Sequence, residues 1–517
     1  MTGPLSNALT RASSRLTRPP TPLASIAIHC LVVGAWLLLF SLAFGWGDAF
    51  GWPGGLAWAV GYAYLAYDTA LLVFTGWQLR HIDRPGIDCP GSDAAPTAGR
   101  DAGLRVAGLR VAGLRVAVIV AAHNELVALP RTLHALLDQT VAPEEIVIAD
   151  DGSSDGTVEM LCAEFGFECP TVDSDAALVR VGSTKVRWLR LSHRGKSGAL
   201  NAGVLSTSAD VIVTVDADTV PDRTAIDALK GAFTAEPALV ACTGVITPKC
   251  RRTVVGRAME WFQTYEYIRN FLARYAWMQV GCLQLLSGAF AGFRRTPVVE
   301  VGGFDDACFV EDYELVARMR RHAGEHGLDW RFRVLGTAQA RTEAPGSVPA
   351  FLRQRRRWFG GFLQTHWWYR AMVGDSRFGG LGTVMLPVKA ADTVAPLYGL
   401  AAVGLLLYFG ATRQFGVLGP ILIVLVGRLV VDMAFQVWAL RRYRRWVGDS
   451  GRASLRSAAL VLVVEPLTFT LLLHLGALLG WFAFLGGGRQ WGRQKRFGLD
   501  PPEVSHRARR PIRPPLG

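Results

Sequence analysis

Five long apolar runs, two near the start of the chain and three near its end, most constrain how it can fold. The first, residues 24–46, carries no charge, and the second, residues 55–77, carries one, Asp68. About 20 helical residues span the ~30 Å hydrocarbon core of a bilayer. The later runs cover residues 384–410, 418–440 and 458–485. We therefore expect transmembrane helices at both ends of the chain, with a polar domain between them.

Composition and charge agree with this arrangement. Half of the residues are hydrophobic and the mean hydropathy is +0.25, which is too apolar for an ordinary soluble enzyme. The net charge is +13, but the arginines gather beside the apolar runs, as Arg11, Arg15 and Arg18 do before the first. Such placement sets membrane topology. We expect no nucleic-acid partner, an integral plasma (inner) membrane protein embedded in the lipid bilayer, and a cytoplasmic domain over about residues 80–380.

The C-terminal topology stays open at this stage. Three spans after the cytoplasmic domain would leave a strongly basic tail outside, against the positive-inside tendency. The last apolar run contains Pro466 and is too short for two full spans. Either one of these segments is re-entrant or the charge rule fails here.

The chain divides into six parts. The eight cysteines lack a Cys-x-x-Cys spacing, so we expect neither disulfides nor a zinc site. A pentad, AGLRV, occurs three times from Ala102, and we assign it no function. The expected parts are a basic segment with two transmembrane helices (1–80), a linker with the pentad repeat (81–114), a catalytic domain (115–348), an interfacial helix region (349–380), about three transmembrane segments (381–486) and a basic tail (487–517).

The central domain alternates strand-like and helix-like segments. Runs rich in β-branched and apolar residues predict strands at 116–121, 145–149, 186–191 and 210–215. Residues 125–137, 157–165 and 198–205 predict helices between or after them. This alternation indicates an α/β domain with a mostly parallel, covered sheet.

Two carboxylates, Asp216 and Asp218, follow the fourth of these strands. The carboxyl edge of an open α/β sheet is where ligands bind. Two adjacent anions repel each other unless a cation lies between them, and Mg²⁺ or Mn²⁺ prefers such oxygen ligands together with phosphates. A turn after a strand would also explain the pair on its own.

Polar residues also follow the other three strands. Glu125 comes after the first, Asp150 and Asp151 end the second, and Lys196 follows the third. We expect Asp150 or Asp151 to accept hydrogen bonds from a base or ribose, and Lys196 to neutralise phosphate. A solvated lysine and a Gly/Ser/Asp turn are the plain alternatives, but four such strand ends are hard to explain by turns alone.

Two further groups lie downstream. Glu311-Asp312 opens an expected helix, so its carboxylate is either a general base or a helix cap. A basic-aromatic stretch follows Pro349 and ends in Gln354-Arg-Arg-Arg357-Trp358. It predicts an interfacial helix, or simply a membrane-surface anchor.

Taken in order, Asp-Asp-Gly-Ser, Asp-x-Asp, Glu-Asp and Gln-x-x-Arg-Trp resemble the membrane-embedded family 2 glycosyltransferases, which include cellulose, chitin, hyaluronan and poly-N-acetylglucosamine synthases. The resemblance covers about residues 115–370. It implies a GT-A (Rossmann-like) catalytic domain inserted between transmembrane helices, an inverting mechanism, a UDP-sugar donor and Mg²⁺ or Mn²⁺.

The resemblance also implies roles for particular residues. Asp312 would be the catalytic base, and Asp216 and Asp218 would face the diphosphate and the metal. The remaining residues would bind the donor (Glu125, Asp150, Asp151, Lys196, with Asp216) or lie near the diphosphate and acceptor (Gln354, Arg357, Trp358). Residues 287–290 would line the acceptor site, with Arg294 and Arg295 just beyond. His123 stands where several members carry Tyr, so its contact with the base stays open.

We therefore expect a processive synthase that adds sugar from UDP-N-acetylglucosamine, or next UDP-glucose, to a β-linked polysaccharide and exports it. Polar residues in the later runs would face the bundle interior or a watery path: Lys389, Asp392, Arg428 and Asp432. A non-processive transferase acting on a membrane lipid is one alternative. A transporter with a regulatory nucleotide-binding domain is another. The sequence identifies no accessory protein.

Overall fold

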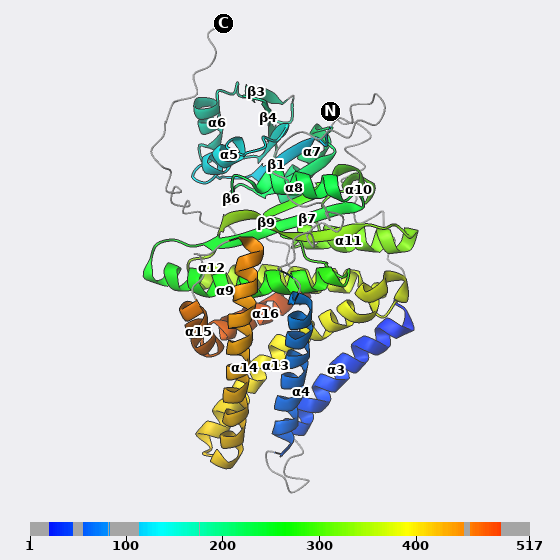
Figure 1. Cartoon of the computed structure of the whole chain (residues 1–517), viewed down its shortest axis with the longest axis vertical. Coiled ribbons are helices and arrows are strands. Elements are labelled where there is room, and N and C mark those ends of the chain that lie inside the picture. The colour runs from blue at the N-terminus through cyan, green and yellow to red at the C-terminus, as the bar shows by residue number, and fades with distance from the viewer. Residues whose placement is uncertain are drawn as a thin grey trace.

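One nine-stranded sheet and two long helices beneath it organise the protein (Figure 1). The computed structural model describes residues 20–44, 55–80, 82, 113–174, 176–448 and 455–487. The basic N-terminal segment, the linker with most of its pentad repeats and the basic tail lie outside the described residues. The strand order is β3-β4-β2-β1-β5-β8-β7-β9-β6.

The first half of the sheet is parallel, as expected. β1 (Val116–Ala122) lies between β2 (Glu145–Asp151) and β5 (Val211–Asp216), and β4 (Thr184–Leu191) pairs with β2. Each expected strand forms, with bounds shifted by no more than two residues. α6 (Thr157–Phe165) matches its prediction, and α7 (Lys196–Ser206) begins two residues earlier than expected. β3 (Ala177–Val181) adds an antiparallel edge.

The expected start of the first helix of this domain is wrong. α5 covers Leu129–Leu137 rather than beginning at residue 125. Pro130 lies in its first turn, where the missing N–H costs no hydrogen bond. Upstream, Asn124 has a positive φ of 57°, so the chain turns sharply between β1 and α5.

The second half of the sheet is mixed, which corrects the expectation of a mostly parallel sheet. β8 (Phe290–Arg294) is antiparallel to both β5 and β7 (Leu239–Lys249), and β6 (Thr219–Pro221) is antiparallel to β9 (Arg331–Glu343). Antiparallel neighbours need no crossover helix, so the strand–helix alternation that predicts parallel strands ends after β5. α8 (Ala225–Ala235) covers β7 and β9.

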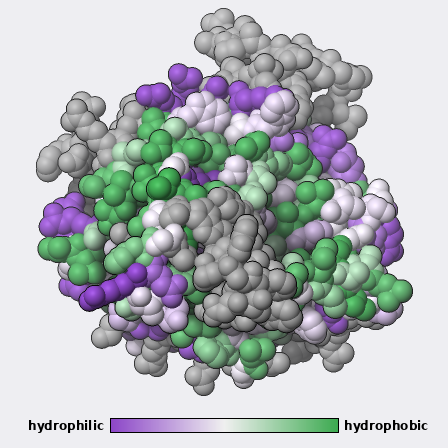
Figure 2. All heavy atoms as spheres, turned by 90° about the horizontal axis from the view of Figure 1, so that it is seen from below, coloured by the Kyte–Doolittle hydropathy of each residue, from purple (hydrophilic) through white to green (hydrophobic). Residues whose placement is uncertain are grey.

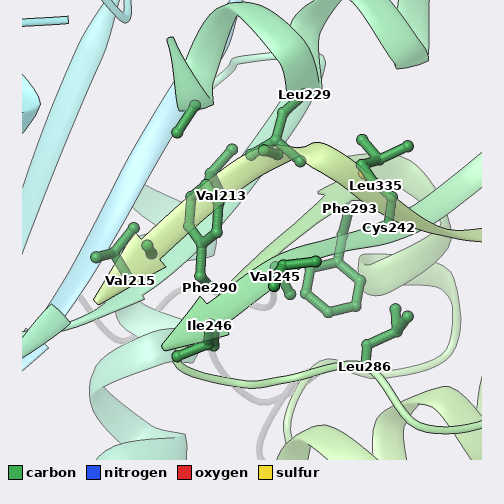
Figure 3. Packing of buried hydrophobic residues seen from close by; sticks show 14 of the residues in the cluster. Val213, Val215, Leu229, Cys242, Val245, Ile246, Leu286, Phe290, Phe293 and Leu335 are labelled. Atoms are coloured by element: carbon green, nitrogen blue, oxygen red, sulfur yellow. The ribbon is translucent and has the colours of Figure 1, made fainter. Parts of the chain in front are cut away.

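The core lies between this sheet and its helices. Figure 3 shows Val213 and Val215 of β5 close to Phe290 of β8, with Val245 and Ile246 of β7 alongside. All of these side chains are almost fully buried. Such residues, buried on a covered sheet, fix the strand register and hence which residues reach the carboxyl edge.

Two helices, α9 (Val254–Gln279) and α12 (Val348–Trp368), lie between the sheet and a bundle of apolar helices (Figure 1). The bundle contains α3 (Leu23–Phe44), α4 (Gly55–Leu79), α13 (Leu386–Ala411) and α14 (Phe415–Val447). Short helical turns join α12 to α13 through α10-like 3-10 and π segments at 370–385. Figure 2 views this end from below and shows apolar side chains gathered widely on it. α10 (Arg295–Glu300) and α11 (Glu311–His326) belong to the sheet side.

Two helices of the described chain are long and apolar enough to cross a membrane, Leu381–Ala411 and Ile421–Val447. This suggests a membrane protein. α3 is apolar over Leu23–Leu38 but shorter than a full span in its described part. α3 and α4 form at the two expected N-terminal positions and contact each other, and they contact α13 and α14 respectively.

The polar residues expected in the spans have partners. Lys389 lies 2.8 Å from Asp392, whose other oxygen accepts a 2.6 Å hydrogen bond from Tyr67 of α4. Arg428 contacts Asp68 of α4 at 2.5 Å and Asp432 at 2.8 Å. An unpaired charge in lipid is costly, so these pairs tie α4 to α13 and α14.

The last apolar run is bent. α15 (Leu455–Val464) and α16 (Phe469–Leu485) meet at 60° across the short turn Glu465–Leu467, which holds Pro466. Both lie just below α9 and α12, whereas α4 and α14 run to the bottom of Figure 1. α16 packs along α12 through Gly480, where a Cβ would lie 2.9 Å from the backbone nitrogen of Gly360. This geometry favours the re-entrant alternative over a third C-terminal span.

We predict that the chain after α16 lies on the same side of the membrane as the catalytic domain. A protease-cleavable epitope inserted after Gly487 should be cut from the same face of oriented vesicles as an epitope in the β3–β4 turn at Gly182. Cleavage of the two epitopes from opposite faces would instead make the bent pair a complete span.

Candidate active site

The register of three strands brings the predicted carboxylates to one edge of the sheet. Asp150 of β2 lies opposite Ala122 of β1, and Asp216 of β5 lies opposite Ala121 on the other side of β1. Because these strands are parallel, their carboxyl ends meet at this edge. The predicted strand-end residues are therefore neighbours in space.

Asp151 holds the loop that leads to Lys196. Its two carboxylate oxygens accept hydrogen bonds from the backbone N–H groups of Arg194, at 2.7 Å, and Gly195, at 2.9 Å. Gly152 keeps a positive φ of 71°, and a Cβ there would lie 3.1 Å from the nitrogen of His193. The side chain that we expected at the base therefore also has a structural task.

Asp150 has one oxygen to offer a ligand. Oδ1 accepts a hydrogen bond from the N–H of Ser153 at 3.0 Å. Oδ2 is buried and has no hydrogen-bond partner among the described residues. Burial raises the pKa of Asp150. A buried, unsatisfied oxygen is costly, so it marks a place where a donor group of a ligand fits. Glu125, from the turn after β1, is buried nearby in sequence.

Lys196 joins two of the predicted groups. Its Nζ lies 2.6 Å from Asp216 Oδ1 and 3.2 Å from Glu311 Oε1. Burial alone would lower the pKa of Lys196, but the two carboxylates outweigh it and raise that pKa. The lysine is therefore a fixed cation and not a solvated surface charge.

Asp216 and Asp218 fit a hard divalent cation. Burial raises the pKa of Asp216, Lys196 opposes that rise, and the nearby charge of Asp218 adds to it. Asp218 Oδ1 receives long hydroxyl contacts of 3.4 Å from Thr219 and 3.3 Å from Thr342. Two mutually repelling carboxylates with oxygen-rich surroundings form the type of donor set that Mg²⁺ and Mn²⁺ accept.

Asp312 is held by backbone groups at the start of α11. Its Oδ2 accepts a 2.6 Å hydrogen bond from the N–H of Gly288, and its Oδ1 accepts one from Tyr313 at 2.9 Å. The helix cap is Val310, so the alternative of Asp312 as a cap is not met. Burial, with the adjacent Glu311, raises the pKa of Asp312 to about 6. A carboxylate poised near neutrality is suited to accept a proton.

The residue facing Asp312 has to be a glycine. A Cβ on Gly288 would lie 2.6 Å from Asp312 Oδ2. Gly288 belongs to the loop 287–290 expected to line the acceptor site, which the structure brings beside the predicted base. The position expected for Arg294 and Arg295 is wrong: β8 runs back from this edge, and Arg294 pairs with Val211 at the start of β5. Both arginines donate to backbone carbonyls there.

The α12 motif approaches from the membrane side. The charge of Arg357, with that of Lys196, lowers the pKa of Glu311 against the effect of burial. Gln354 is buried, and its Oε1 has no hydrogen-bond partner among the described residues. Trp358 lies under the guanidinium of Arg355, 4.5 Å from the ring centre.

Arg355 is the member of this motif that sequence reasoning missed. It forms a two-pronged ion pair with Glu266 of α9, at 2.6 and 2.8 Å, with both side chains buried. Burial raises the pKa of Glu266, and Arg355 opposes that rise. The same helix exposes Trp367 near its end, with Arg370 4.1 Å from the ring centre. Thus α12 combines a buried site face with a surface-anchor end.

Glu311 and Gly288 were also under-read from the sequence. Glu311 was visible only as the neighbour of Asp312, although it is the second partner of Lys196. A lysine and a carboxylate more than a hundred positions apart give no spacing signal. Only the meeting of α7 and α11 reveals the contact.

Comparison with known proteins agrees with this geometry. The family profile described as Glycosyl transferase family 2 matches residues 117–302. The profile described as Glycosyl transferase family group 2 matches residues 211–486, more than half of the chain. The chain belongs to this glycosyltransferase family. The GT-A-type α/β fold expected for this family 2 glycosyltransferase is confirmed.

Curated relatives share about a quarter of their residues with the chain. The poly-beta-1,6-N-acetyl-D-glucosamine synthase of Staphylococcus aureus (strain COL) is 26% identical over 244 residues, which are 47% of this chain and 53% of the relative. The synthase of that name from Staphylococcus epidermidis is 27% identical over 247 residues, 47% of this chain and 53% of its own. The match thus spans about half the length of these relatives.

Solved structures show a looser likeness. A mannosyltransferase from Pyrobaculum calidifontis, solved with GDP-Man and Mn²⁺, covers 80% of this chain and 99% of its own, with 19% identity and a TM-score of 0.49. Glucosyl-3-phosphoglycerate synthase from Mycobacterium tuberculosis, solved with UDP and Mn²⁺, covers 49% of this chain and 80% of its own, with 17% identity and a TM-score of 0.30.

We predict that Arg355→Met lowers the free energy of unfolding by about 3–5 kcal/mol, because it leaves Glu266 buried without its partner. The double variant Arg355→Met/Glu266→Met should recover most of this loss. Denaturant unfolding of the detergent-purified protein, followed by tryptophan fluorescence, measures both. The exposed Arg353 offers the matched control, since Arg353→Met should change stability by about 0.5 kcal/mol or less. Equal effects of the two single variants would contradict a buried ion pair.

Proposed function

We propose that the protein is an inverting, processive glycosyltransferase that extends a β-linked polysaccharide from a UDP-sugar and exports the chain through its membrane helices. One observation carries the proposal: the cation Lys196 joins Asp216 to Glu311, and Glu311 is adjacent to the base candidate Asp312. A place for a leaving diphosphate and a base for an acceptor hydroxyl therefore lie in one network.

The proposed reaction is a single displacement. Asp312 accepts the proton of the acceptor hydroxyl while the oxygen of that hydroxyl bonds to the anomeric carbon. The bond from that carbon to the diphosphate breaks, and UDP leaves with the electron pair. A hydroxyl is a poor nucleophile unless a base is within hydrogen-bond reach. Attack opposite the leaving group inverts the anomeric centre.

Other residues position the two substrates in this proposal. Lys196 and Arg357 stabilise the negative charge that develops on the leaving group. Asp150 and the loop held by Asp151 receive the nucleoside end, with Glu125 beside them. Gln354 offers its buried amide oxygen to the acceptor or diphosphate, and Trp358 gives a flat face for a pyranose ring. Mg²⁺ or Mn²⁺ held by Asp216 and Asp218 would neutralise diphosphate charge.

UDP-N-acetylglucosamine is the favoured donor, followed by UDP-glucose. The names of the two staphylococcal relatives support the first choice. The contact of α12 with the re-entrant candidate α16 supports export, since it places the acceptor motif against the membrane bundle. We further propose that the protein resides in the plasma (inner) membrane with its active site facing the cytoplasm.

We expect the reaction to need Asp312 as a carboxylate. Because its pKa is raised to about 6, activity should be full well above that pH and fall about tenfold per pH unit below it. Asp312→Asn should lower kcat by about 10²–10⁴-fold at every pH. UDP release from membranes measures both, and Asp306→Asn, on the exposed neighbouring aspartate, is the control. An unchanged rate in Asp312→Asn would remove the base assignment.

We expect purified membranes offered labelled UDP-sugars to make a polymer ladder with UDP-N-acetylglucosamine. EDTA should abolish the product, and added Mg²⁺ or Mn²⁺ should restore it. A single glycolipid product would replace processive synthesis with lipid glycosylation. Release of no UDP from any donor would favour the transporter alternative, and full activity in EDTA would remove the metal from Asp216 and Asp218.

A further inference from the structure

Two exposed histidines flank Asp151 on the side away from the Asp216–Asp218 pair. Among the residues that the structure describes, His123, Asp151 and His193 form the one group of three whose ligand atoms suit a metal ion, all lying within 4.8 Å of one another. His123 follows β1, Asp151 ends β2, and His193 follows β4. The parallel order of these strands brings the three together.

The three groups are already in contact. His193 Nδ1 lies 2.8 Å from Asp151 Oδ2, and His123 Nδ1 lies 2.7 Å from the carbonyl oxygen of Asp151. The two rings are 4.5 Å apart between centres. His123 Nε2 faces the amide of Asn124 at 3.0 Å, so Nδ1 is the atom that points into the group.

This donor set differs in kind from the acidic pair. Asp216 and Asp218 present only oxygen, which suits Mg²⁺ and Mn²⁺. Two imidazoles and one carboxylate suit Zn²⁺, Co²⁺ and Ni²⁺, with water as the fourth ligand. A tetrahedral ion with bonds of about 2.0 Å needs ligand atoms about 3.3 Å apart. Small rotations of the two exposed rings bring the present spacing to that value.

The remaining ligand is rigid, which favours binding. Asp151 is 3% exposed, and the N–H groups of Arg194 and Gly195 hold its carboxylate. An ion here would thus meet one preorganised oxygen and two side chains open to solvent. It would also be coupled to the loop that ends at Lys196.

We propose that His123, Asp151 and His193 bind a zinc-class cation, and that this ion and the nucleoside end of the donor exclude each other. The second part rests on the proposed function, which puts the base beside Asp150 and Asp151. The expected consequence is that Zn²⁺ inhibits turnover competitively against the UDP-sugar, even with Mg²⁺ in excess.

Cobalt binding tests the site without any reaction. Co²⁺ added to the purified full chain, with Mg²⁺ in excess, should give the strong visible absorption of a four-coordinate site with one equivalent bound. His123→Phe and His193→Phe should each weaken binding at least tenfold. His134→Phe is the matched control, because His134 also contacts a carboxylate, Glu164, at 2.7 Å, but lacks a second histidine. Absence of the band, or its loss in the control alone, would overturn the proposal.

Competition tests the second part. UDP should displace bound Co²⁺ from the wild-type chain, and Zn²⁺ should raise the apparent KM for the donor without lowering kcat. In Asp216→Asn the cobalt band should persist, which separates this site from the magnesium pair. A cobalt band that UDP leaves unchanged would overturn mutual exclusion. A chain that binds Co²⁺ but turns over no UDP-sugar would instead count against the proposed function.

Discussion

A buried lysine between two carboxylates is the interaction on which the site depends. Asp216 comes from the central sheet, Lys196 from α7 and Glu311 from α11, so the two contacts of one ammonium join three separate elements. Each carboxylate alone would be costly to bury, because burial disfavours the charged form. The cation offsets this cost and holds Asp312, the next residue after Glu311, at a set distance from the sheet edge.

The same principle links the catalytic half to the membrane half. Glu266 and Arg355 join the two helices beneath the sheet, and Arg269 of α9 contacts Glu465 at the bend between α15 and α16. Glycines then allow α12 and α16 to approach closely: a Cβ on Gly476 would lie 2.5 Å from the Cβ of Arg355. Ion pairs therefore set which helices meet, and small residues set how near they come. The acceptor motif on α12 is positioned by both sides.

The strands up to β5 and the residues at their ends followed from the sequence because local pattern determines them. β-Branched runs predict buried strands, and parallel order then predicts that Asp150 and Asp216 share an edge. The later strands could not be predicted in this way. β8 is antiparallel, and this reversal carries Arg294 to the far edge, away from the acceptor site that linear distance suggested. Likewise, Pro130 and the turn at Asn124 shortened a helix that apolar spacing alone extended.

The sequence by itself determined the family, the α/β class of the central domain, the apolar segments around it and the identity of the charged residues at the strand ends. These depend on short-range periodicity and on motifs, which are readable along the chain. Tertiary structure decided the partners: Glu311 for Lys196, Gly288 for Asp312, Glu266 for Arg355, and the two histidines beside Asp151. Such contacts join residues far apart in the chain. They arise only when packing of the sheet and helices fixes the register and brings those surfaces together.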